Sequence, residues 1–147
     1  MSARFDLSKD APKAYQALYN VTNVLGEGSL SKQLKHLIDL RVSQLNGCTY
    51  CIDLHTGWAR GDGETDERLA AVAGWRQSPL FTPDEKAALA WAEALTERRK
   101  DQIDDLHAQL GQHFDRAGIG ELTMMVAVVN AWNRAGIAFH RESAQAA

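Results

Sequence analysis

Cysteine and proline are scarce in this chain of 147 residues, and it has no long apolar run. With only two cysteines, a framework of several disulfides is excluded. No apolar stretch approaches the roughly 20 residues that a membrane-spanning helix requires. The first ten residues lack the apolar core of a secretory signal. We therefore expect no membrane partner and a cytoplasmic location.

The chain also lacks an excess of positive charge. Its formal net charge is −3, which gives no electrostatic basis for binding nucleic acid. Hydrophobic residues make up 45% and charged residues 24%, as in ordinary globular proteins. The length fits one domain over residues 1–147 with a core of its own.

Sustained apolar–polar alternation is missing as well, so we expect no sheet. Helical spacing of apolar residues instead predicts an all-α bundle of six to seven helices. Their expected ranges are about 12–25, 32–45, 48–60, 66–73, 83–95, 104–114 and 120–141. The expected N-caps are Ser8 or Asp10, Ser29 or Ser31, Thr65, and Thr82, the last as part of a capping box with Glu85.

Both cysteines lie in one short motif, Cys48 and Cys51, with His55 four residues after the second. On a helix these three side chains return to nearly the same face. Asn46-Gly47 before them is typical of a turn, so a helix starting near Cys48 would place its positive end beside the sulfurs. This setting and the nearby imidazole favour a reactive thiolate, and two thiols can close to a disulfide.

Other chemistry must be weighed against this redox interpretation. A c-type haem site needs histidine directly after the second cysteine, but position 52 is Ile. Zinc could use the two cysteines and His55 with a fourth ligand from elsewhere, although no second ligand pair has the usual spacing. Two buried cysteines could also serve core packing alone. The absence of an expected sheet argues against a thioredoxin-like protein.

The sequence at 40–55 reads Leu-Arg-Val-Ser-Gln-Leu-Asn-Gly-Cys-Thr-Tyr-Cys-Ile-Asp-Leu-His. It resembles the signature of the AhpD-like alkyl hydroperoxidases in the carboxymuconolactone decarboxylase superfamily. The similarity continues through Pro79–Thr82, Ala88–Thr96 and Asn130–Arg134, with the core of the motif at 34–96. The resemblance implies an all-α fold, assembly into trimers or hexamers, and reduction of organic hydroperoxides by thiols with a dithiol reductant or reducing protein as partner.

The resemblance also implies roles for single residues. Cys51 would be the peroxidatic cysteine, Cys48 the resolving one, and His55 part of the proton relay. Members of the superfamily with lyase or lactone chemistry generally lack the cysteine pair. We therefore expect a thiol peroxidase with no metal and no organic cofactor.

One position departs from the family pattern. Its relay commonly begins with glutamate twelve residues before the first cysteine, where this chain has His36, and Tyr50 stands where some members have histidine. His36 can still pass a proton and is kept as a catalytic candidate. It supplies no negative charge beside His55. Asp39, one turn along, is either a substitute for the glutamate or a solvated surface charge.

Two alternatives to a peroxidase stay open: a redox-responsive binding or sensor protein without useful turnover, and a non-redox lyase or isomerase. Outside the motif, we expect His107 and His113 at the surface and His140 beside the C-terminal dipole of the last helix. Asn130 and Asn133 are expected to bond buried backbone or a partner subunit. The tryptophans are expected in the core or an interface, with Trp58 also a candidate for lining a substrate cleft.

Overall fold

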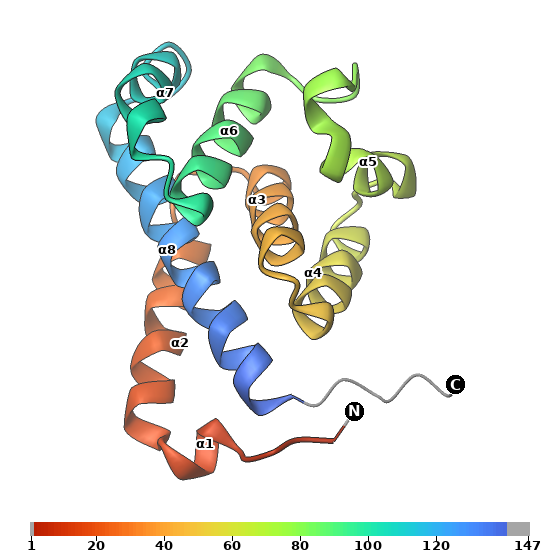
Figure 1. Cartoon of the computed structure of the whole chain (residues 1–147), viewed down its shortest axis with the longest axis vertical. Helices are drawn as coiled ribbons and strands as arrows, with labels where there is room; N and C mark the ends of the chain where they lie inside the picture. The colour runs from red at the N-terminus through yellow and green to blue at the C-terminus, as the bar shows by residue number, and fades with distance from the viewer. Residues whose placement is uncertain (1, 141–147) are drawn as a thin grey trace.

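Helix α3, Lys32–Asn46, lies at the centre of the fold in the computed structural model, which describes residues 2–140 (Figure 1). It packs against α4, α6 and α8, so its buried residues are spread around the helix rather than confined to one stripe. Leu37, Ile38 and Val42 are completely inaccessible to solvent. The cysteine motif follows α3 directly, and its position is therefore fixed by this central helix.

The remaining elements are also helical. They are α1 Leu7–Asp10, α2 Pro12–Gly26, α4 Thr49–Gly61, α5 Asp66–Ala71, the 3₁₀ helix η1 Val72–Gln77, α6 Pro83–Glu97, the 3₁₀ helix η2 Lys100–Gln102, α7 Ile103–Leu110 and α8 Arg116–Phe139. Residues 2–140 contain no strand; Ala3 and His140 form one isolated bridge that brings the two ends of this stretch together. The expected all-α fold is confirmed. Within the same residues no helix is long and apolar enough to cross a membrane.

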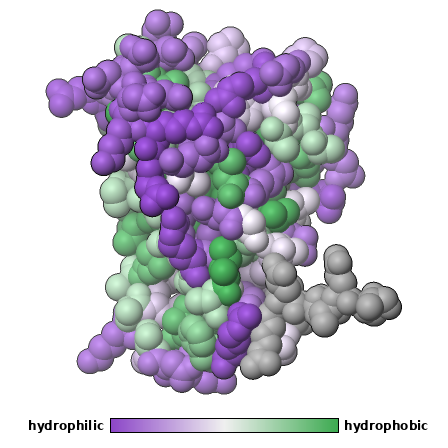
Figure 2. All heavy atoms as spheres, in the orientation of Figure 1, coloured by the Kyte–Doolittle hydropathy of each residue, from purple (hydrophilic) through white to green (hydrophobic). Residues whose placement is uncertain are grey.

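Helix α2 stands apart from this arrangement. It lies beside α8 (Figure 1), and none of its residues is buried. Tyr15 and Tyr19 pack edge-on against Trp132 of α8, whose indole nitrogen donates a hydrogen bond of 2.8 Å to Thr22. Figure 2 shows hydrophobic side chains gathered over the lower left of the molecule, where α2 lies in Figure 1.

A buried carboxylate ties α3, η1 and α6 together on the other side of the core. Glu93 is only 2% exposed and accepts hydrogen bonds from Arg41, Arg76 and the indole of Trp75, at 2.7 to 2.8 Å. Burial alone raises the pKa of a carboxyl group, but these three donors together hold the pKa of Glu93 below its usual value. Glu93 is therefore an ionised structural residue and not a free acid.

Several helix boundaries differ from expectation. Ser31 and Thr65 do cap α3 and α5, but Asp6 caps the additional helix α1, and α2 has no side-chain cap. Thr82 precedes α6 without the expected capping box, because its hydroxyl donates to Asp84.

Two further boundaries were placed wrongly. The expected helix over 66–73 ends earlier, because the chain tightens into η1 from Val72. The last helix starts at Arg116 and not near 120, since Asp115 caps it by accepting from the backbone of Gly118.

Candidate functional site

The turn between α3 and α4 presents the two cysteines. Gly47 closes α3 with φ of 65°, a conformation that glycine adopts without strain. Asn46, just before it, donates to Asn130 and Asn133 of α8, each at 2.9 Å. Cys48 is then the N-cap of α4, as expected, and its sulfur accepts from the backbone of Cys51 at 3.3 Å.

Cys48 and Cys51 are joined as a disulfide, and both are buried, with 2% and 5% of their surface exposed. The disulfide packs directly on the backbone of α8. A Cβ added at Gly136 would lie 3.1 Å from Sγ of Cys51 and 3.2 Å from Sγ of Cys48. Only glycine leaves this space for the sulfurs.

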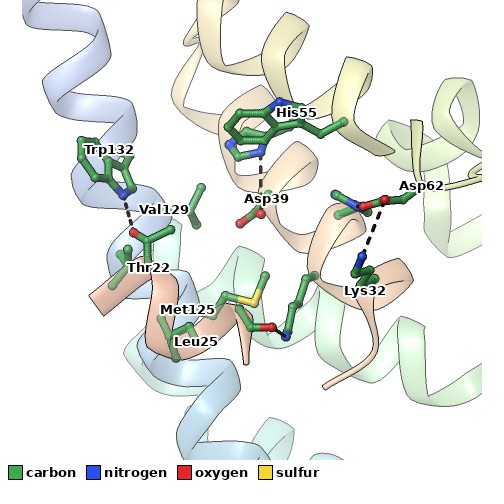
Figure 3. A pocket seen from close by; sticks show the side chains of 14 residues that line it. Thr22, Leu25, Lys32, Asp39, His55, Asp62, Met125, Val129 and Trp132 are labelled. Atoms are coloured by element: carbon green, nitrogen blue, oxygen red, sulfur yellow. Dashed lines mark hydrogen bonds and ion pairs between the residues drawn. The ribbon is translucent and has the colours of Figure 1, made fainter. Parts of the chain in front are cut away.

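A cavity of about 250 Å³ opens beside α4, and we call it the His55 cavity (Figure 3). Apolar side chains from α2, α4 and α8 form most of its wall: Leu25, Trp58, Met125, Val128, Val129 and Trp132. Polar and charged groups from α3 and α4 form another part of it: Lys32, Lys35, His36, Asp39, His55 and Asp62. Such a cavity suits a small molecule with an organic body and a polar reacting group.

His55 and Asp39 face each other across this wall, with Nδ1 and Oδ2 3.6 Å apart (Figure 3). Burial, reinforced by the positive charge that His36 can carry, lowers the pKa of His55 from 6.5 to about 4. Burial raises the pKa of Asp39 to about 7, although Lys35 acts against it. At neutral pH the imidazole is therefore uncharged, with a free lone pair, although the lowered pKa makes it a weaker base than a solvated histidine. Asp39 is not a freely solvated surface charge.

His36 lies in the same cavity but has a different partner. Its Nε2 is 2.7 Å from Oδ2 of Asp62, the C-cap residue of α4, and Lys32 lies 3.8 Å from the other oxygen. The hydrogen bond from His36 is the main cause that lowers the pKa of Asp62. The C-terminal end of α4 thus supplies a carboxylate, that of Asp62, to the His36 ring.

A second cavity, of about 360 Å³, lies at the other end of the motif, and we call it the Cys48 cavity. Its wall consists of Arg4, Asn46, Gly47, Cys48, Thr49, Tyr50, Gly136, Ile137 and His140. It has no lining residue in common with the His55 cavity. Of the two cavities, only the Cys48 cavity is lined by a cysteine.

His140 belongs to this second cavity and is the C-cap residue of α8, which is the position expected for it at the C-terminal end of the last helix. Arg4, not His140, donates to the last carbonyls of α8, from Ile137, Ala138 and His140 itself. The His140 ring stacks on Tyr50 at 3.6 Å between centroids. Both of its ring nitrogens are buried and find no hydrogen-bond partner among residues 2–140.

The structure places Cys48, Cys51 and His55 at the start and in the first two turns of α4, and His36 and His55 line the same cavity. Gly136 and Asp62 were not singled out from the sequence. Gly136 lies far from the motif along the chain, whereas Asp62 directly follows α4; neither position is marked by a local sequence pattern. His107 and His113 are exposed, as expected, and Asn133 is fully buried and donates to Ser43. Trp58 lines the cavity, 54% exposed, with its ring edge-on to His55.

A metal centre was the main alternative for these ligands. In the described part of the chain, no group of three or more histidine, cysteine and acidic side chains is placed to hold a metal ion. The two sulfurs are bonded covalently to each other.

Comparison with known proteins gives consistent matches. The profile of the carboxymuconolactone decarboxylase family matches residues 10–94. The chain is 32% identical to the uncharacterized protein YdfG of Bacillus subtilis (strain 168), over 98% of this chain and 99% of that protein.

Solved structures agree. A protein of unknown function from Agrobacterium tumefaciens, provisionally described as an antioxidant defence protein AhpD, has a TM-score of 0.90 at 31% identity, covering 98% of this chain and 100% of its own. An alkylhydroperoxidase AhpD core from Ralstonia eutropha JMP134, an uncharacterized peroxidase-related protein, has a TM-score of 0.80 over 90% of this chain and 71% of its own. At 20% identity that second likeness is one of fold alone.

Proposed function

Because the chain belongs to the carboxymuconolactone decarboxylase family and is one of its AhpD-like members, we propose that it is a thiol-dependent peroxidase. Its substrates are organic hydroperoxides, and it works through a Cys48–Cys51 dithiol–disulfide cycle. One observation carries the proposal. A redox-competent cysteine pair at the start of α4 is followed one turn later by His55, an uncharged base on the wall of an apolar cavity.

The chemistry follows from these groups. In the reduced protein, His55 takes the proton of Cys51, and the thiolate attacks the outer oxygen of the hydroperoxide. The O–O bond breaks, the alkoxide leaves as an alcohol with the proton from His55, and Cys51 becomes a sulfenic acid. Cys48 then displaces water from that sulfur and forms the disulfide. A dithiol reductant restores both thiols.

Asp39 and His36 serve the proton path in this proposal. Asp39 faces Nδ1 of His55 and orients the imidazole, taking the place of the glutamate that the family commonly has. His36 lies on the cavity wall with Asp62 behind it and exchanges protons between His55 and solvent.

The setting of the cycle is proposed as well. A dithiol that must be reduced again after each turnover fits the cytoplasm, where thiols are kept reduced. The chain is proposed to assemble as a homo-oligomer, a trimer or hexamer. The exposed apolar side chains of α2 and α8 support this, with Val24 at 69% and Met124 at 51% exposure.

The test is thiol loss in the reduced protein after one equivalent of cumene hydroperoxide is added. We expect fast loss of both thiols with an intramolecular disulfide as product. Cys51→Ser should abolish the reaction, and His55→Ala should slow it by about 10²-fold or more, as removal of a general base does.

The competing functions give other results. A redox sensor would form the disulfide but would not turn over repeatedly with excess dithiol and peroxide. A non-redox lyase or isomerase would lose its thiols no faster than a free cysteine does. Either result would refute the peroxidase.

A further inference from the structure

The disulfide is reached from the Cys48 cavity and not from the cavity where the peroxide is proposed to bind. Cys48 lines the former, whereas neither cysteine lines the His55 cavity. Gly136 lines the Cys48 cavity too and packs on both sulfurs, and any side chain there would occupy that space. Of the two cavities, the Cys48 cavity is therefore the one that gives access to a sulfur of the disulfide.

We propose that the Cys48 cavity is the binding site for the reducing dithiol, whose thiolate attacks Sγ of Cys48. The inference rests on the proposed function only in taking the disulfide to be reduced during turnover. Peroxide and reductant would then use separate openings.

Attack at Cys48 gives a complete cycle. The first thiolate of the reductant forms a bond to Cys48, the Cys48–Cys51 bond breaks, and its electron pair leaves on Cys51. The second thiol of the reductant then attacks the mixed disulfide and releases Cys48. The reductant departs as its own disulfide, oxidised by two electrons; one of its protons passes to Cys48 and the other to solvent, so that Cys51 is left as the thiolate. Attack on this sulfur regenerates the Cys51 thiolate directly, which is the species needed for the next peroxide.

The cavity wall suits an incoming thiolate. None of its lining residues is acidic, and Arg4 places a guanidinium at the rim. Cys48 is the N-cap of α4, so the positive end of that helix faces the reacting sulfur. Negative charge on the reductant is thus favoured at this approach.

His140 supplies the proton acceptor at this site. Its ring is held against Tyr50 and Phe139, with centroids 3.6 and 3.9 Å apart, and both ring nitrogens lack a partner among residues 2–140. The neutral imidazole takes the proton of the first thiol of the reductant. It returns that proton to Cys48 when Cys48 is released from the mixed disulfide. The reaction uses a nitrogen that the fold leaves unused.

The experiment measures reduction of the full-length disulfide form, prepared with diamide so that it does not depend on peroxidase activity. Ile137, at 48% exposure, forms part of the cavity wall. We expect Ile137→Trp to slow reduction by dithiothreitol about tenfold or more, which is 1.36 kcal/mol in the barrier, and to leave oxidation by cumene hydroperoxide unchanged. Thr22→Trp, on the wall of the His55 cavity, is the matched control. It should slow oxidation by cumene hydroperoxide and leave reduction by dithiothreitol unchanged.

A second arm tests His140. Tris(2-carboxyethyl)phosphine attacks sulfur without a thiol proton to remove, so His140→Ala should slow dithiothreitol about tenfold and leave the phosphine rate unchanged. Equal slowing of both reductants would overturn the role of His140.

The cavity assignment has its own refuting outcomes. It is overturned if Ile137→Trp is reduced at the wild-type rate, or if it slows reduction and oxidation alike. Ile137→Phe replaces the first variant if circular dichroism shows that the tryptophan does not fold. If the protein proved to have no peroxidase activity, these reduction rates could still be measured, because the disulfide form is prepared with diamide.

Discussion

Asp39 and His55 exchange a proton when the chain folds. In the unfolded chain near pH 5 the imidazole is protonated and the carboxyl is ionised. In the folded chain the pKa of His55 is lowered to about 4 and that of Asp39 is raised to about 7, so the proton sits on Asp39. The number of bound protons hardly changes, and the two contributions to pH-dependent stability oppose each other.

Removing Asp39 should expose the contribution of His55. A lowered pKa means that the unfolded state binds more protons between pH 6.5 and about 4, so acid favours unfolding. We expect the free energy of unfolding of Asp39→Asn to fall as pH drops through this window, by up to about 1.4 kcal/mol per pH unit relative to wild type. Urea titrations at several pH values measure this slope.

The reverse variant provides the second half of the test. In His55→Ala the raised pKa of Asp39 acts alone, so stability should fall as pH rises from about 4 to 7. Asp53→Asn, at an exposed position on α4, is the control, and its stability should have the same pH dependence as that of wild type. If the free energy of unfolding of Asp39→Asn also had the pH dependence of wild type, the proposed transfer of a proton from His55 to Asp39 on folding would be wrong.

The sequence identifies the site residues only where the signal is local. Cys48, Cys51 and His55 were found because helical spacing alone puts them on one face. The sequence left two roles for Asp39, a member of the proton relay or a solvated surface charge, because helix periodicity does not show which neighbouring helix covers that face of α3. The packing of α4 on α3 distinguishes them. Asp62 is brought to His36 from 26 residues away, and no local pattern marks it.

At the scale of elements, the approach of α8 to the disulfide depends on one missing side chain. Glycine within a helix costs about 1 kcal/mol relative to alanine. That cost is accepted at Gly136 because a Cβ there would lie 3.1 and 3.2 Å from the two sulfurs. Glycine at position 136 lowers the stability of α8 as a helix but permits close contact between α8 and the start of α4.

Gly136→Ala should therefore destabilise the protein although alanine is the better helix former. Overpacking costs about 1–3 kcal/mol, and the gain in helix propensity offsets about 1 kcal/mol of it, which leaves a net loss of up to about 2 kcal/mol. Thermal unfolding of the disulfide form measures the change.

Gly120, in the same helix, offers the matched control. An added Cβ there meets nothing within 4 Å, so Gly120→Ala should raise stability by about 0.5–1 kcal/mol. The close contact at the disulfide would be disproved if both variants were stabilised equally.

The helices themselves were largely predictable, because apolar periodicity and the caps Ser31 and Thr65 are local signals. The start of α8 was not. Gly118 and Gly120 suggest a break, but Asp115 bonds the backbone of Gly118 and the helix is held by its buried face, including Leu122. Tertiary packing overrides weak propensity here.

At the scale of the whole molecule, α2 is an element without enough partners. None of its residues is buried. Its contacts with the rest of the chain are an aromatic layer of Tyr15 and Tyr19 on Trp132, packing of Leu25 against the core, and hydrogen bonds from Trp132 to Thr22 and from Lys35 to the carbonyl of Gly26. A helix of this length rarely persists in water without a buried apolar face. Burial against a second copy of the chain would supply that face.

Charge placed on the outer side of α2 should therefore break the oligomer. Val24 is 69% exposed in the single chain, and burying it in a subunit contact would stabilise the assembly by about 1.5–3 kcal/mol per subunit. We expect Val24→Glu to elute as a monomer, whereas wild type elutes as a trimer or hexamer, in size-exclusion chromatography with light scattering. Gln16→Glu adds the same charge at another exposed position of α2 and should assemble normally if that position lies outside the contact. A monomeric wild type, or an assembled Val24→Glu, would show that α2 is not the subunit contact. The peroxide and thiol reactions of α4 would still be measurable in either case.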